Sequence, residues 1–90
     1  MNLQPLDDEN QFKINDIVKF NSHRFPYVIY AKYLGDRNKW DASVEILYNP
    51  RPDRSPKEGR GWVISRFKKD LILCTKEDIL KLAILRMKEE

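Results

Sequence analysis

The chain has few of the residues that build metal sites and redox centres. Its 90 residues include a single cysteine, Cys74, and a single histidine, His23. A zinc site needs three or four Cys, His or carboxylate ligands, and a disulfide needs two cysteines. We therefore predict no metal, and the lone cysteine excludes an internal disulfide, as is usual in the reducing cytoplasm. No other cofactor is expected.

Glycine and long apolar runs are also scarce. The three glycines, Gly35, Gly59 and Gly61, form neither a phosphate-binding loop nor a dinucleotide fingerprint. The longest apolar stretches, at residues 27–31 and 82–85, fall far short of the roughly 20 residues that span a bilayer. The N-terminus lacks the basic start and apolar run of a secretory signal. We expect a cytoplasmic protein that does not interact with membranes.

Catalytic chemistry has few candidates. Asp36, Asp41 and Glu45 lie in or beside a predicted hairpin turn, where Asp is favoured because its side chain bonds to the backbone. Cys74 ends an apolar strand, which is typical of a buried thiol rather than a nucleophile. His23 falls in a polar turn with no evident partner. We therefore predict that the protein is not an enzyme.

Charge and aromatic rings, in contrast, are abundant. Charged residues make up 34% of the chain and aromatic residues 11%, and the formal net charge is +3. Its distribution is uneven: residues 18–69 hold twelve Lys or Arg against five acids, a net charge of +7. The acids collect toward the two ends. A basic, aromatic-rich middle of this kind indicates an anionic partner.

The order of the predicted elements is five short strands followed by one helix. Alternating or β-branched runs bounded by turn residues predict the strands. Thr75 followed by Asp78 resembles a capping box and predicts a helix over residues 76–88. We expect a mainly β, α+β fold: residues 1–11 as a flexible arm, then one domain over residues 12–90, a five-stranded antiparallel barrel or bent sheet with a C-terminal helix. An open sheet of three or four strands is the alternative. The strands are expected near residues 16–20, 27–34, 42–48, 62–67 and 71–74.

The segment Asn15-Asp16-Ile17-Val18-Lys19-Phe20, the alternating third strand, Gly61-Trp62-Val63-Ile64 and Leu71-Ile72-Leu73 together resemble the strand order of SH3-like small barrels of the KOW and Tudor type. The resemblance covers roughly residues 13–74. In the Tudor type it implies an aromatic cage, for which Trp40, Tyr48 and Trp62 are the candidate walls. In size and composition the chain also resembles accessory proteins of bacteriophages.

Periodicity assigns the apolar positions to faces. In the third strand the even positions, 42 to 48, are expected to face inward. One arc of the helix, containing Ile79, Leu80, Ala83, Ile84 and Met87, should dock on the sheet. Leu82 and Leu85 lie outside this arc and are candidate partner-binding residues, including for a weak homodimer; otherwise the chain is a monomer. The expected core is Val18, Phe20, Ile29, Val44, Ile46, Trp62, Ile64, Leu71, Leu73, Ile79, Ala83 and Ile84.

Two functional hypotheses remain. The first is a nucleic-acid-binding module of low sequence specificity, for DNA or RNA, because exposed rings stack on bases while cations bind phosphates. The second is a protein-interaction or inhibitor module that binds a partner such as a host protein through the proline-rich basic loop at residues 49–60, a sheet edge or the helix. The candidate nucleic-acid-binding residues are Arg51, Arg54, Lys57 and Arg60 in the loop, with Arg37, Lys39 and Trp40 in the hairpin turn.

Overall fold

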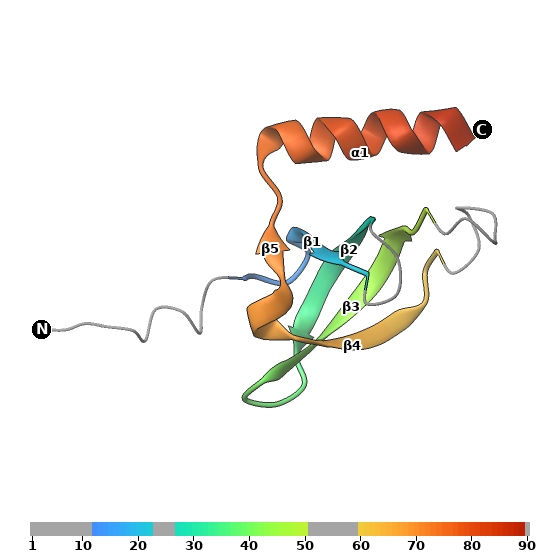
Figure 1. Ribbon diagram of the computed structural model, residues 1–90. Helices are drawn as coiled ribbons and strands as arrows, with labels where there is room; N and C mark the ends of the chain where they lie inside the picture. The colour runs from blue at the N-terminus through green and yellow to red at the C-terminus, as the bar shows by residue number, and fades with distance from the viewer. Residues whose placement is uncertain (1–11, 23–26, 51–59, 90) are drawn as a thin grey trace, which may run out of the picture.

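The computed structural model describes residues 12–22, 27–50 and 60–89 (Figure 1). Five antiparallel strands form one sheet in the order β4-β3-β2-β1-β5, and one α-helix follows. The predicted five-stranded antiparallel sheet and C-terminal helix are confirmed. The predicted arm lies outside the described residues. The elements are β1 (Ile17–Asn21), β2 (Val28–Asp36), β3 (Asp41–Tyr48), β4 (Val63–Phe67), the 3₁₀ helix Lys68–Asp70, β5 (Ile72–Leu73) and α1 (Lys76–Glu89).

The sheet is open, with β4 and β5 as its two edges. Its first four strands form a meander in which each strand pairs with its neighbour in sequence. The short β5 returns to the other side of β1, where Val18 lies opposite Leu73. No pairing between β4 and β5 is described, so the strands make a bent sheet and not a closed barrel.

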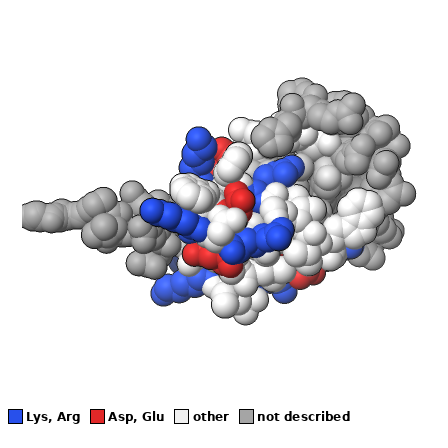
Figure 2. Space-filling model, turned by 90° about the horizontal axis from the view of Figure 1, so that it is seen from below, with Lys and Arg blue, Asp and Glu red and all other residues white. Residues whose placement is uncertain are grey.

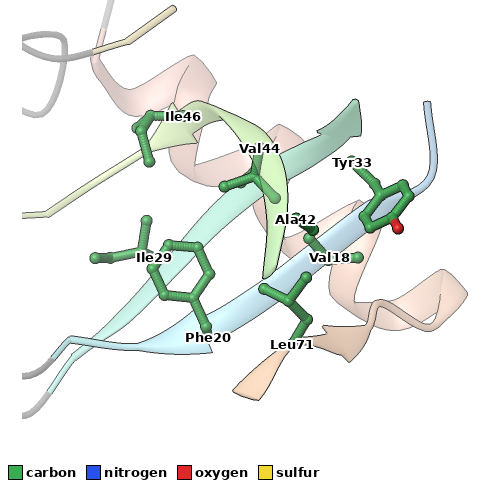
Figure 3. Packing of buried hydrophobic residues seen from close by; sticks show 9 residues of the cluster. Val18, Phe20, Ile29, Tyr33, Ala42, Val44, Ile46 and Leu71 are labelled. Atoms are coloured by element: carbon green, nitrogen blue, oxygen red, sulfur yellow. The ribbon is translucent and has the colours of Figure 1, made fainter. Parts of the chain in front are cut away.

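One face of the sheet carries the larger hydrophobic cluster, here called the first core (Figure 3). In β3 the alternate side chains Ala42, Val44 and Ile46 point into it, because successive residues of a strand point to opposite faces. Six residues of the expected core are confirmed here: Val18, Phe20, Ile29, Val44, Ile46 and Leu71. The first core consists of these six with Ala31, Tyr33 and Ala42.

A β-bulge interrupts the pairing of β2 with β3. Tyr30 lies opposite Tyr48 and Ala31 lies opposite Ile46, so Leu47 is an extra residue in β3. An extra residue reverses the alternation beyond it. Tyr48 is buried, as expected, but on the opposite face from Ile46. The prediction that the even positions from 42 to 48 are buried is confirmed, but Tyr48 is buried on the other face of the sheet.

This reversal adds Tyr48 to a second core on the other face of the sheet. It consists of Tyr30, Tyr48, Cys74 and Leu82, each at most 9% exposed. The rings of Tyr30 and Tyr48 meet edge to face with centroids 6.4 Å apart. Because Leu82 belongs to α1, the second core is where the helix packs on the sheet.

The N-terminus of α1 is capped and tied to the sheet. Thr75 Oγ1 accepts a hydrogen bond from the Asp78 N–H at 3.1 Å, and Asp78 Oδ2 accepts one from the Thr75 N–H at 2.9 Å, so the predicted capping box is confirmed. Lys19 of β1 donates to Asp78 Oδ1 at 3.0 Å. The Thr75 N–H and then Lys19 hold the pKa of Asp78 below its ordinary value.

The helix presents the opposite face to the one predicted. Leu82 is 5% exposed and Leu85 is half-buried against the second core, so neither is the exposed partner-binding residue expected from periodicity. The reason lies at residue 78: positions 78, 82 and 85 lie on one helix face, and the bond from Lys19 to Asp78 turns that face to the sheet.

Several residues of the expected core are at the surface, some because of this helix rotation and others because of their place in the sheet. Trp62 and Leu73 are about half exposed because they occupy or adjoin the edge strands β4 and β5, whose outer sides the sheet does not cover. Ile64 is only partly buried. The exposed members of the predicted helix arc are Ile79, Leu80, Ala83, Ile84 and Met87.

Shortening Leu82 should therefore destabilise the protein far more than shortening Leu80. We expect Leu82→Ala to lower the free energy of unfolding by about 2–5 kcal/mol, because it leaves a cavity in the second core. Leu80→Ala is the matched control on the exposed face and should stay within about 0.5 kcal/mol of wild type. Urea denaturation of both variants measures the difference, and equal losses would contradict the docking face described here.

Candidate nucleic-acid interface

The β2–β3 turn, residues 37–40, is built by one asparagine. Asn38 Oδ1 accepts hydrogen bonds from the N–H groups of Trp40 and Asp41, both at 2.8 Å. The Arg37 N–H donates to the Asp41 carbonyl at 2.8 Å. An Asx turn of this kind fixes the backbone with local bonds. The Trp40 side chain is left 67% exposed.

The C-terminal end of β4 lies beside this turn. Asp41 pairs with Phe67, and the Lys68 N–H donates to the Trp40 carbonyl at 2.8 Å. Phe67 is 54% exposed. The chain thus brings two exposed rings, distant in sequence, to the same end of the sheet.

A lysine ammonium group lies near each of these two rings. Lys39 Nζ lies 5.8 Å from the centroid of the Trp40 ring, and Lys69 Nζ lies 5.9 Å from that of Phe67. Arg37 joins the same end because its guanidinium donates to the Ser65 hydroxyl. The hairpin-end surface is defined by Arg37, Lys39, Trp40, Phe67 and Lys69.

Acidic groups are interspersed with these cations. Lys68 forms an ion pair with Asp36 at 3.1 Å, and the Tyr33 hydroxyl donates to the same carboxylate. The Tyr33 hydroxyl and then Lys68 lower the pKa of Asp36, while burial raises the pKa of Tyr33. In Figure 2, which views the molecule from the end that holds the turn, blue and red side chains lie close together. Positive and negative side chains are therefore mixed at this end of the molecule, and the charge of Lys68 is already neutralised by Asp36.

The structure divides the predicted nucleic-acid-binding residues into two groups. Arg37, Lys39 and Trp40 lie together in the turn. Arg60 lies at the other end of β3, because the next residue, Gly61, donates its N–H to the Ile46 carbonyl at 2.8 Å. The eight residues of β3 span about 25 Å, so Arg60 is far from Trp40. Arg51, Arg54 and Lys57 lie outside the described residues.

Phe67 and Lys69 were not predicted as site residues. Both stood out only as part of the aromatic and basic middle of the chain. The missing information is the register of β3 with β4, which places Phe67 opposite Asp41. The alternation of residues 62–67, which places Phe67 on the face opposite Ile64, is the one sequence signal that could have indicated exposure.

The three candidate walls, Trp40, Tyr48 and Trp62, do not form an aromatic cage of the Tudor type. Tyr48 is 9% exposed and belongs to the second core. Trp40 precedes β3, whereas the Trp62 carbonyl accepts a hydrogen bond from the Ile46 N–H near the other end of that strand. The two tryptophans therefore do not converge on one pocket.

Outside the hairpin-end surface, Cys74 is buried and Arg66 borders a hollow. Burial raises the pKa of Cys74 to about 11, so its sulfur is a thiol at neutral pH. Arg66 lies 5.0 Å above the Phe20 ring and lines a shallow open hollow of about 170 Å³, too small for a typical small-molecule site. In the ranges that the structure describes, no three His, Cys, Asp or Glu side chains gather as a metal site, and no helix is long and apolar enough to cross a bilayer.

Comparisons with protein-family models, with curated proteins and with solved structures give no significant match.

The carboxylate of Asp36 should make stability depend on acid pH. Its pKa is lowered on folding, so its contribution is present above its unfolded value of about 3.8 and is lost as the pH falls through the lower folded value. Between pH 7 and pH 2, the Asp36→Asn variant should lose less stability than wild type. Thermal unfolding across this pH range measures the loss. Tyr33→Phe should lie between the two.

The control is Asp70→Asn, which removes a carboxylate that forms no ion pair with any described residue. Asp70→Asn leaves the bonds from Tyr33 and Lys68 to Asp36 in place. A profile for Asp36→Asn that coincides with that of wild type would show that the bonds from Tyr33 and Lys68 do not matter in solution.

Proposed function

We propose that the protein is a non-enzymatic module that binds single-stranded nucleic acid at the hairpin-end surface with low sequence specificity. The observation that carries this proposal is the pairing of each exposed ring with a cation, Trp40 with Lys39 and Phe67 with Lys69. An exposed aromatic ring stacks on any base, contributing about 1–3 kcal/mol per base, while neighbouring ammonium groups attract the phosphates.

Low specificity is inferred from the kind of contacts available. Stacking is tolerant of base identity, whereas reading base edges needs fixed side chains such as Arg, Asn or Gln aimed into a groove. Among the described residues the one α-helix, α1, exposes an apolar face and not such a row. We therefore do not propose that α1 reads base edges in duplex DNA.

We propose that the fold is of the SH3-like type, with a sheet that is bent but not closed into a barrel. The meander order, with β1 between β2 and β5 and one core enclosed by the bend, supports it. On this view the hairpin-end surface is one end of the bent sheet, formed by one turn and one strand end. It lies away from α1, which packs near the opposite end of β3 (Figure 1).

Removing the Trp40 ring should weaken binding. Trp40→Ala should raise Kd for labelled single-stranded oligonucleotides by about 5- to 150-fold, the equivalent of one lost stacking contact. Trp62→Ala is the matched control, because Trp62 is similarly exposed but lies near the other end of β3. Fluorescence anisotropy with DNA, RNA and duplex probes measures the effect. Equal losses in the two variants would contradict the hairpin-end site.

The cations should account for salt dependence. If Arg37, Lys39 and Lys69 each neutralise one phosphate, log K against log salt falls with a slope of about −2 for a single strand. Lys39→Glu/Lys69→Glu should flatten the slope and weaken binding at low salt. Lys76→Glu/Lys81→Glu makes the same charge change on α1 and should alter binding little. No binding of any probe at low salt would end the proposal.

A further inference from the structure

The outer face of α1 is apolar and uncovered by the described part of the chain. Ile79 is 44% exposed, Leu80 63%, Ile84 46% and Met87 72%. With the exposed Ala83 they occupy positions i, i+1, i+4, i+5 and i+8, which form one helix face. A solvated helix normally shows polar residues there. These five residues are called the α1 stripe.

The chain does not cover the stripe by rotating the helix. The bond from Lys19 to Asp78 and the packing of Leu82 in the second core hold the opposite face of α1 against the sheet. Figure 1 shows α1 as the outermost element, with its far side open. Rotating α1 so that the stripe packs on the sheet would expose Leu82 and break the ion pair.

Three residues of the stripe are evenly spaced about its smallest member, Ala83. Ile79 lies four residues before Ala83, and Met87 lies four residues after it. A twofold axis through Ala83 would place Ile79 of one copy beside Met87 of the second copy. The small side chain at the centre allows the two backbones to approach closely. Self-complementarity of this kind is what an isologous dimer interface requires.

The charges of α1 favour the same arrangement. Its first turn contains Lys76, Glu77 and Asp78, of which Asp78 is paired with Lys19, and its last turn contains Arg86, Lys88 and Glu89, so a net negative end faces a net positive one. An antiparallel pair brings Glu77 of one helix near Lys88 of the other and opposes the helix dipoles. A parallel pair would bring like charges together.

We propose that two copies of this chain associate through the α1 stripe, with their helices antiparallel about a twofold axis near Ala83. A second copy is chosen as the partner because the same helix, when reversed, places Ile79 beside Met87 and Glu77 near Lys88. The interface replaces the one predicted from Leu82 and Leu85, which instead pack on the sheet. It is independent of the proposed nucleic-acid function.

Sedimentation velocity of the full chain from about 5 to 500 µM tests association. We expect the wild type to dimerise as its concentration rises, and Leu80→Glu/Met87→Glu to remain monomeric with an unchanged circular dichroism spectrum, since both side chains are exposed. Val63→Glu is the control: Val63 is 59% exposed on the edge strand β4. A monomeric wild type, a dimer that persists in the stripe variant, or one lost only in Val63→Glu would overturn the proposal.

Oxidative cross-linking tests the orientation. Ala83→Cys should form an intermolecular disulfide, because a twofold axis nearby brings the two copies of residue 83 together. Ile79→Cys alone should not, since the two copies would lie about 12 Å apart along the helix axis. A mixture of Ile79→Cys and Met87→Cys should cross-link as a heterodimer. Self-linking of Ile79→Cys would indicate parallel helices and overturn the proposal, and buried Cys74 gives little background.

Discussion

The arrangement of the molecule depends on one extra residue in β3. Because Leu47 forms a bulge, Tyr48 turns to the face opposite Ile46 and meets Tyr30 there. The bulge therefore adds a large ring to the hydrophobic cluster on the second face of the sheet. The second cluster is what gives α1 a place to pack, and a helix that packs through Leu82 must expose the α1 stripe. The bulge thus contributes to which face of α1 is left exposed.

Polar contacts select the rotation of the helix, which its apolar pattern leaves open. Apolar residues occur on both sides of α1, so two docking faces were available. Asp78 serves both as a member of the capping box and as the partner of Lys19, and it lies on the same face as Leu82. The ion pair of Lys19 with Asp78 is partly exposed, so it is a modest source of stability. It is compatible with only one of the two helix rotations, the one that also buries Leu82.

The regular elements and the first core could be predicted from the sequence because they follow local rules. The alternation of Val44 and Ile46 and the Thr75 cap are signals within a few residues. The bulge at Leu47 has no comparable signal, so the face of Tyr48 and the docking of Leu82 were missed. The candidate site behaved similarly: the exposed turn with Trp40 was predicted, whereas Phe67 joined it only through strand register, and Arg60 was assigned to it although β3 holds the two ends apart.

The return of β5 to β1 has a consequence for the folding pathway. Every other strand pairs with its sequence neighbour, but Val18 pairs with Leu73, 55 residues further along the chain. Closing so long a loop costs entropy before any contact repays it. The hairpins of β2, β3 and β4 are therefore expected to form early, and β5 with α1 to dock late. Changes at Leu82 should then mainly accelerate unfolding, whereas changes at Val44 should mainly slow folding.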